Sequence, residues 1–514
     1  MISSDPYGLD YSVVRQMFRE RWTWRISYLA MVLLGAVLAL LAWRRAAGPF
    51  PVAVALLLCL LAAWALHPLL AMHLTVFFTL IGDSVSAYWY PMAKNFSSRE
   101  SILFIHDRLT FSPLDVTIGF AVACLLLRRI ATGVPIVKGP LFWPLVVFTS
   151  FVMVGLVYGL AKGGDSRIAV FEVRPLLYLP MVYVLVSNLC RDTRHYRHLL
   201  WTAVAAVLVQ SLISLSYYFD LSHAATADLE SLGEHGSAIA MNSVFLLAIA
   251  WSALRRCSVA GRVVLTIICI PIVWVYFLSN RRAAVIGLII GVAMFAVILF
   301  WRQKRTFWKF APAATVLLTV YVGAFWNSTS GAGFPAQAVK SVIAPDAVSS
   351  RDESSSLYRV IENTDLHFTI RQNKIMGVGF GNPFYQPIRL PDISANFEFH
   401  NHIPHNSILW IWLQTGFAGF VAMFYVLGRS LMLGASRIRR LPDGPNVAAM
   451  TSATLFIVTF FVFAFVDIAW DARNMVMLGV SFAMCANFPT TRPPVVPGES
   501  SWREPAVAGV GSSR

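Results

Sequence analysis

Long apolar runs recur along the whole chain, and they limit its possible folds more than any other feature of the sequence. A helix of roughly 20 apolar residues is long enough to cross the bilayer core. Of the 514 residues, 57% are apolar and only 13% are charged, whereas soluble globular proteins carry about 25% charged residues. This composition excludes a soluble enzyme, a disordered chain and a disulfide-rich scaffold. We therefore predict an all-α polytopic membrane protein with about 12–14 transmembrane helices.

The apolar runs define the expected domain organisation. Residues 1–25 form a cytoplasmic leader, because the first run has no small-residue cleavage site behind it. Residues 26–326 form a transmembrane bundle, and residues 406–488 add the C-terminal transmembrane helices. Residues 489–514, rich in Pro, Gly and Ser, form a disordered cytoplasmic tail. The fourteen individual spans are predicted near residues 26–43, 50–66, 68–82, 113–128, 140–160, 172–190, 198–217, 237–254, 261–279, 283–301, 308–326, 406–428, 447–467 and 474–488.

The net charge of +15 is distributed as a membrane topology signal. With a cytoplasmic N-terminus, most Lys and Arg residues fall in the cytoplasmic turns and most acidic residues fall outside, as the positive-inside rule requires. Turns such as 191–197 and 437–440 are examples of basic cytoplasmic segments. The excess base thus indicates topology and attraction to anionic membrane lipids, and no nucleic-acid partner is expected.

Residues 327–405 are the only extramembrane segment large enough to form a structured element. The segment opens with Ser/Gly-rich stretches that are typical of flexible chain. Residues 357–374 have the composition of one or two amphipathic helices lying over the membrane face. Gly377, Gly379 and Gly381 then interrupt any helix and force a loop.

Arginines on the predicted outer side are the first candidates for a binding site. Arg281 and Arg282 lie in an outer turn against the positive-inside bias, so an anion should compensate them. A bound phosphate or pyrophosphate would do so through bidentate hydrogen bonds, and lipid phosphates at the interface are the alternative. Arg174, at the predicted outer start of a span, either pairs with Glu172 to anchor the helix end or faces the same cavity as a second cation.

A histidine cluster precedes the span at residue 406, and it admits three interpretations. His400, His402 and His405 with Glu398 have the composition of a zinc site. Alternatively, His405, placed by Pro404 at the first helical turn, accepts a proton from a hydroxyl. In the third interpretation the cluster only caps a helix at the interface.

The motifs around these residues resemble those of the bacterial O-antigen ligase and polymerase superfamily. His405-Asn406-Ser407-Ile408-Leu409 followed by Thr415-Gly416-Phe417-Ala418-Gly419 resembles its His-Asn-x-x-Leu and Thr-Gly-x-x-Gly signature. Arg359 followed by Gly377-Val378-Gly379-Phe380-Gly381 resembles the Arg and Gly-x-Gly-x-Gly stretch of its large periplasmic loop. Residues 279–287 resemble its Ser-x-x-Arg-x-x-x-x-Gly segment, with Arg282 at the arginine. Asn363 stands where that family usually has an aromatic residue.

The resemblance implies a GT-C-like helical bundle in the bacterial inner membrane, with a large periplasmic loop and a periplasmic active face. It implies transfer of a glycan from an undecaprenyl-pyrophosphate carrier to a sugar hydroxyl, either of lipid A-core or of another glycan repeat. The transfer inverts the anomeric carbon and requires no metal or other cofactor. Arg282 and His405 are the implied catalytic residues. The expected substrate-binding residues are Arg281, Arg174, Arg359, Asn406, Gly377 and Gly379.

Two other classes of function remain open on the sequence. A lipid-linked glycan flippase or secondary transporter would use the same arginines only to hold phosphate during transport, and it would need charged groups midway along its spans. The predicted charges instead gather at the outer span ends, as at Arg174, Arg282 and Asp467. A zinc-dependent membrane hydrolase built on the three histidines is the other alternative.

Overall fold

The computed structural model describes residues 49–92, 94–223, 232–234, 236–328, 331–344, 350–394 and 397–490. The predicted leader, the span near residues 26–43 and almost all of the tail lie outside the described residues. All regular secondary structure in these ranges is helical. The helices are α2 (Phe50–Leu66), α3 (Pro68–Ile81), α4 (Pro113–Thr132), α5 (Phe142–Ala161), α6 (Ser166–Leu189), α7 (Thr193–His223), α8 (Ser237–Ala253), α9 (Val259–Leu278), α10 (Arg282–Arg302), α11 (Lys304–Ala324), the 3-10 turn η1 (Gly331–Gly333), α12 (Phe334–Ile343), α13 (Ser350–Gln372), α14 (Ser407–Arg440), α15 (Pro445–Val466) and α16 (Ala472–Asn487).

The prediction of a polytopic membrane protein is confirmed. Within the described ranges, eight helices are long and apolar enough to cross a membrane, and α2, α3 and α8 are shorter apolar helices. Each described helix of the bundle overlaps one of the predicted spans, because an apolar run long enough for the bilayer has no other stable conformation there.

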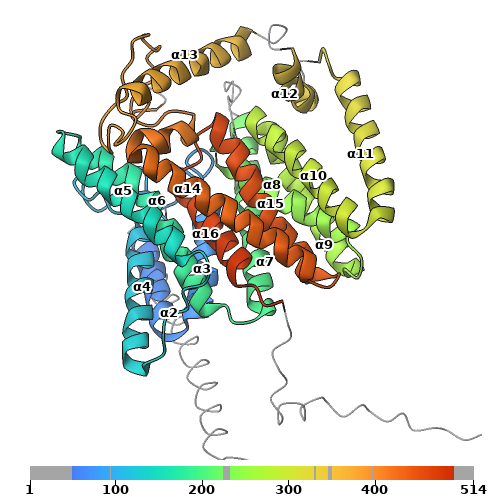
Figure 1. The fold of residues 1–514 in the computed structure, drawn as a ribbon, viewed down its shortest axis with the longest axis horizontal. Coiled ribbons are helices and arrows are strands. Elements are labelled where there is room, and N and C mark those ends of the chain that lie inside the picture. Colours follow the sequence, from blue (N-terminus) through green and yellow to red (C-terminus); the bar gives the residue numbers. More distant parts are fainter. Residues whose placement is uncertain are drawn as a thin grey trace, which may run out of the picture.

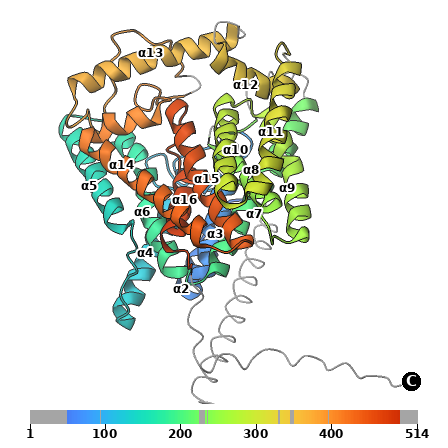
Figure 2. The same ribbon diagram turned by 45° about the vertical axis from the view of Figure 1, so that its right-hand side comes forward.

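The helices form a bundle that is covered at one end by α13 (Figures 1 and 2). Helices α14, α15 and α16 pack together, and α15 also packs against α8 and α10. Most side chains of α15 and α16 are buried, so these helices form the centre of the core. Helix α11 has no buried residue and lies at the edge of the bundle. We call the end covered by α13 the α13 end.

Several helices differ in length from their predictions, among them α7, which spans Thr193–His223 against the predicted 198–217. Helix α6 begins at Ser166, six residues before the predicted start, because the Asp165 side chain accepts hydrogen bonds from the first turn. Helix α13 is a single helix that begins before the predicted amphipathic segment, at Ser350. Helix α14 continues to Arg440, although Gly416, with φ of 69° and ψ of −177°, interrupts its helical geometry.

At the end of the bundle opposite to α13, arginines bind main-chain carbonyls. Arg302, in the last turn of α10, donates to Leu441 O at 2.8 Å and pairs with Asp443 at 2.9 Å. Arg437, in the last turns of α14, donates to Cys485 O at 2.5 Å and Phe488 O at 3.1 Å. The last carbonyls of a helix have no partner within the helix and carry partial negative charge, so these arginines stabilise helix C-termini.

Candidate functional site

Helix α13 lies beside the start of α14, and one of its carboxylates binds the histidine that precedes α14. The His405 backbone N–H donates to Glu362 Oε2 at 3.0 Å, and ring Nδ1 lies 3.1 Å from Glu362 Oε1. The Glu362 side chain is 1% exposed and that of His405 is 18% exposed. Tyr358 packs edge-on against the imidazole, with ring centroids 5.6 Å apart. Helix α13 therefore fixes both the position and the orientation of His405.

The contact with Glu362 defines the tautomer of His405. A carboxylate only accepts hydrogen bonds, so Nδ1 donates to Glu362, and in the neutral ring Nε2 is the nitrogen that can accept a proton. An imidazole held in this way by a carboxylate is suited to take a proton from a hydroxyl. The expected place of His405 in the first helical turn is wrong by two residues, because Asn406 is the N-cap and α14 begins at Ser407.

Asn406 connects α14 to α13. Its Oδ1 accepts a hydrogen bond from Leu409 N at 3.0 Å, which caps the helix, and its Nδ2 donates to Asn363 Oδ1 at 2.9 Å. Asn363 is the residue that departs from the resembled family pattern, and here it supplies this second contact. The side-chain amide of Asn406 thus holds two helices in register.

Arg359 and Arg281 share the electrostatic field of Asp467. Arg359 Nη2 lies 3.9 Å from Asp467 Oδ2, and the Asp467 side chain is only 3% exposed. Arg281 Nη2 donates to Gly233 O at 3.2 Å. Burial lowers the pKa of the Arg281 guanidinium, whereas the Asp467 carboxylate raises it and Arg359 lowers it further. The two predicted arginines therefore come together at the α13 end around one buried carboxylate.

Arg282 is the first residue of α10, directly after Arg281. The first turn of this helix contains no acidic residue. A helix N-terminus carries partial positive charge, and the guanidinium groups of Arg281 and Arg282 add to the positive potential at this end of α10. The arrangement can therefore hold a phosphate group.

The connection between α15 and α16 is held against α14. Ser407 Oγ donates to Asp467 O and accepts from Ala469 N, both at 3.0 Å. Trp470 Nε1 donates to Ser407 O at 2.7 Å. The first turn of α14, next to His405, therefore also positions Asp467, the partner of Arg359.

The predicted glycines allow close main-chain packing. Gly377 and Gly379 have φ of +70° and +81°, a conformation that favours glycine. A Cβ on Gly377 would collide with the Leu413 carbonyl, and one on Gly379 would lie 2.6 Å from Gly159 Cα. Val378 N donates to Leu413 O at 2.7 Å. The glycine-rich segment is thus packed directly onto α5 and α14.

Arg174 lies in the wall of a cavity of about 430 Å³ between α6, the α3–α4 connection, the α15–α16 connection and the segment before α14 that includes Ile403. Its Nη1 donates to Asn95 Oδ1 at 2.5 Å and to Asp115 Oδ2 at 3.2 Å. The expected pairing with Glu172 is therefore wrong. Arg174 is also not at the start of the span, because α6 begins eight residues earlier, at Ser166.

Glu172 instead binds the glycine-rich segment and α14. Its Oε2 accepts from Gly381 N at 2.7 Å, and its Oε1 accepts from Gln414 Nε2 at 3.1 Å. The residue is 2% exposed and lines the same cavity as Arg174. Glu172 and Arg174, two residues apart on α6, thus have separate partners.

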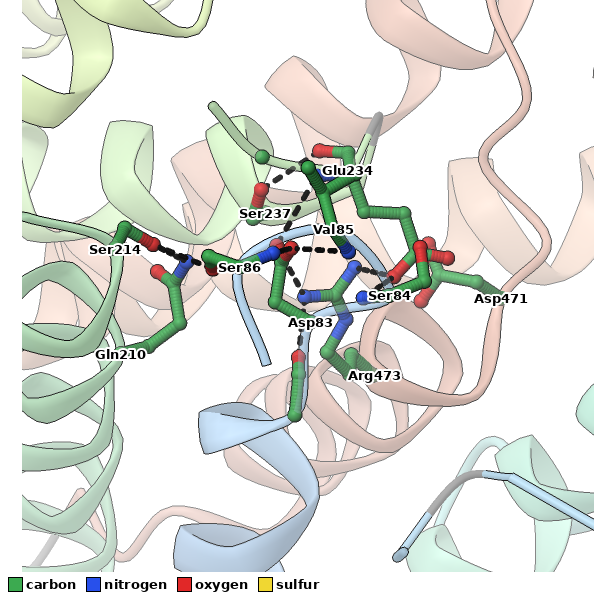
Figure 3. A network of polar contacts seen from close by, with 12 residues as sticks. Asp83, Ser84, Val85, Ser86, Gln210, Ser214, Glu234, Ser237, Asp471 and Arg473 are labelled. Carbon is green, nitrogen blue, oxygen red and sulfur yellow. Dashed lines mark hydrogen bonds and ion pairs between the residues drawn. The ribbon is translucent and has the colours of Figure 1, made fainter. Parts of the chain in front are cut away.

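A buried arginine, Arg473 of α16, joins three segments at the wall of this cavity (Figure 3). Its Nη2 donates to Glu234 Oε2 at 2.6 Å, and its Nη1 donates to Gly82 O at 2.6 Å and lies 3.5 Å from Asp83 Oδ2. Asp83 Oδ2 also accepts from Glu234 N at 3.0 Å. Arg473 therefore fixes the α3–α4 and α7–α8 connections to the first turn of α16.

Asp471 caps α16 beside this network, as its Oδ1 accepts from Asn474 N at 2.9 Å. Burial raises the pKa of the Asp471 carboxyl to about 6, and the nearby Arg473 charge opposes this rise. Asp471 and Arg473 both line the cavity.

The residues named by the zinc alternative do not converge on one point in the structure. His400 Nε2 lies 4.0 Å from Asp392, whereas His405 binds Glu362. Among the residues that the structure describes, no three His, Cys, Asp or Glu side chains are grouped so that they could hold a metal ion. The hypothesis required convergence of His400, His402 and His405 with Glu398.

The structure thus divides the predicted residues into two groups. His405, Asn406, Arg359 and Arg281 gather around α13 and Asp467, with Arg282 next in the chain, whereas Arg174 belongs to the cavity wall. Glu362 was not predicted from the sequence. Its spacing of three residues from Arg359, on one face of an expected helix, is the only signal that could have indicated it.

Comparison with known proteins identifies the region that contains the first group. Residues 264–424 match the O-antigen ligase family. This region of the chain is thus similar to O-antigen ligases. An O-antigen ligase of Salmonella typhimurium is 30% identical over 127 residues, which cover 23% of this chain and 31% of that protein. The chain thus matches about a third of the length of this curated relative. The matched region includes every predicted site residue except Arg174.

Proposed function

We propose that this protein is an inner-membrane glycosyltransferase that acts at the α13 end, which is the periplasmic face. It moves a glycan from an undecaprenyl-pyrophosphate carrier to a sugar hydroxyl. The observation that carries the proposal is the His405–Glu362 pair, held next to Arg359 and Arg281 within the region that matches the O-antigen ligase family. A base beside guanidinium groups is the arrangement that displacement of a pyrophosphate by a hydroxyl requires.

In this proposal His405 activates the acceptor. Nε2 takes the proton of the acceptor hydroxyl as its oxygen forms a bond to the anomeric carbon. The bond between that carbon and the phosphate oxygen breaks, and its electron pair leaves with the pyrophosphate. Attack opposite to the leaving group inverts the anomeric configuration. Glu362 keeps Nδ1 protonated and stabilises the imidazolium that forms.

The arginines stabilise the leaving group. Arg282, at the N-terminus of α10, is the main contact for pyrophosphate, and Arg281 and Arg359 assist it. Negative charge increases on the pyrophosphate as the bond breaks, so fixed guanidinium groups lower the barrier. They take the place that a divalent cation has in many phosphate sites, so the transfer requires no metal.

The cavity next to Arg174 accommodates the acceptor glycan. Its lining combines acids, bases and aromatic rings, including Phe171, Trp410 and Trp470. Because acidic and basic side chains are present in similar number, the cavity suits a neutral polyhydroxyl ligand better than a pyrophosphate. Gly377 and Gly379 allow the glycine-rich segment, residues 377–381, to cover the site while packed closely on α14 and α5. The acceptor is either lipid A-core sugar, for a ligase, or another glycan repeat, for a polymerase.

Transfer by the purified protein tests this proposal. The full chain in detergent is given undecaprenyl-pyrophosphate glycan and each candidate acceptor in the presence of EDTA. Wild type is compared with Glu362→Gln and Glu362→Asp, and with His402→Ala as the control near the same loop. We expect transfer with EDTA, a fall in kcat of at least about 10-fold in Glu362→Gln, and partial recovery in Glu362→Asp.

The outcomes separate the alternatives. The acceptor that gives product decides between ligase and polymerase. Wild-type activity that EDTA abolishes contradicts the metal-independent mechanism. Carrier binding without any transfer favours a flippase or transporter. Full activity in Glu362→Gln excludes the role given to the His405–Glu362 pair.

A further inference from the structure

A second cavity lies at the end of the bundle opposite to α13, and its lining is basic. It measures about 710 Å³ and is formed by α2, α3, α4, α6 and the start of α7. Its lining includes three arginines from two separate segments, Arg128, Arg129 and Arg191, and three histidines, His67, His73 and His195. Of the described residues that line it, none is acidic. The cavity therefore has a positive potential that no carboxylate of its own wall reduces.

The arginines of this cavity retain donors for a ligand. Arg128 Nη2 binds Ala65 O, and Arg129 Nη2 binds Asn188 Oδ1 at 3.1 Å. Each guanidinium has five N–H donors, so one such contact with the described residues leaves most of its hydrogen-bonding capacity. Asp192, next to Arg191 in the chain, does not line the cavity, and its Oδ1 accepts from His195 N at 2.8 Å. Several arginine N–H donors around one cavity suit a phosphate, which accepts several charge-assisted hydrogen bonds.

The first turn of α3 adds to the positive potential. Pro68, Leu69 and Leu70 line the cavity at the N-terminus of this 14-residue helix. Backbone N–H groups at a helix N-terminus have no partner within the helix, and they carry partial positive charge. This turn lies beside the arginines of α4 and thus supports the binding of an anion.

The remaining wall is apolar and belongs to membrane helices. Trp64, Leu125, Leu185 and Leu189 line the same cavity, and they come from α2, α4 and α6. A free phosphate or a soluble anion gains nothing from such a wall, whereas the glycerol and upper acyl carbons of a phospholipid do. Basic pockets between membrane helices are suited to anionic lipid headgroups.

We infer that this cavity is a binding site for an anionic phospholipid, whose phosphodiester contacts Arg128, Arg129 and Arg191 and whose acyl chains lie along α2, α4 and α6. The site is separate from the residues assigned to glycan transfer. The inference therefore does not depend on the proposed function.

Lipid binding by the full-length protein tests the inference. Delipidated protein in mild detergent is titrated with cardiolipin, phosphatidylglycerol, phosphatidylcholine or glycerol phosphate, and bound lipid is counted by native mass spectrometry. The test variant is Arg128→Gln with Arg191→Gln. The matched control is Arg255→Gln with Arg439→Gln, which removes the same charge from exposed residues that do not line the cavity.

We expect cardiolipin and phosphatidylglycerol to bind to wild type and to the control with equal affinity. Each arginine near an anionic lipid contributes roughly fivefold, so the test variant should bind about 30-fold more weakly. Size-exclusion profiles and thermal midpoints without lipid establish that both variants fold. Three results overturn the inference: equal binding of phosphatidylcholine, equal loss in both variants, or competition by glycerol phosphate at the same concentration as lipid.

Discussion

The arginines at the two ends of the bundle have different kinds of partner. At the α13 end, Arg359 and Arg473 face the carboxylates of Asp467 and Glu234. At the opposite end, Arg302 and Arg437 donate mainly to main-chain carbonyls at helix C-termini. A carbonyl at a helix end is a fixed structural acceptor, whereas a carboxylate–arginine pair can exchange its acid for another anion. Arg302 and Arg437 thus serve structure, whereas Arg359 has a partner that another anion can replace.

The largest effect is expected at the histidine of the α13 end. His405→Ala removes the proposed base, so glycan transfer should fall by about 10²–10⁴-fold while the fold is kept. Initial rates of transfer, together with the size-exclusion profile, measure this. His402→Ala, in the same loop, should stay near wild type. A variant at His405 with more than half of the wild-type rate would remove it from the mechanism.

A matched pair of arginine variants tests the comparison directly. Arg282→Ala should lower transfer by about 100-fold, as for loss of one stabilising donor, with little change in the thermal midpoint. Arg302→Ala should lower the free energy of unfolding by about 1.5–3 kcal/mol, since charge-assisted hydrogen bonds are lost, with normal activity per folded molecule. Denaturation curves and transfer rates of both variants give the answer. If both variants lose the same property, the two ends do not differ as described.

Glycine variants sharpen the comparison at the main chain. Gly377→Ala forces a left-handed conformation and a collision with the Leu413 carbonyl, so it should destabilise the α13 end by at least about 1–3 kcal/mol and reduce transfer. Gly428→Ala lies in α14 with open space around its Cβ position and should be neutral or slightly stabilising. Thermal midpoints compare the two. Equal midpoints would show that the glycine-rich segment is not packed as described.

The smallest effect concerns Asp471. Burial raises its pKa to about 6 in the folded protein, so the folded state holds a proton that the unfolded state releases at lower pH. Its contribution to stability is therefore present at acidic pH and is lost as pH rises toward 6. Asp471→Asn, which keeps an N-cap, should gain stability relative to wild type between pH 4.5 and 7.5. Thermal midpoints at both pH values measure this, and a difference that is constant with pH would contradict the shift.

The sequence predicted the helices of the bundle well and the contacts of the site poorly. Apolar runs place helices such as α2 and α15 almost to the residue, since the bilayer permits few other conformations. Glu362 gave no comparable signal, because one glutamate in a polar helix looks like any solvated residue until α13 is placed against α14. The partners of Arg174 and Glu172 were mistaken because residues two apart on a helix point in different directions and do not face each other.

The interruption of α14 at Gly416 determines how the cover of the site can move. Phe417 N donates to Ile375 O at 3.1 Å across this break, and Val378 N donates to Leu413 O on its other side. The segment after α13 is therefore hydrogen-bonded to the main chain of the membrane helix α14 on both sides of the break. Lifting it would leave main-chain groups of both segments without partners, at several kcal/mol for each group in an apolar setting. Residues 375–378 are therefore fixed to α14, and any opening of the rest of the loop has to pivot about them.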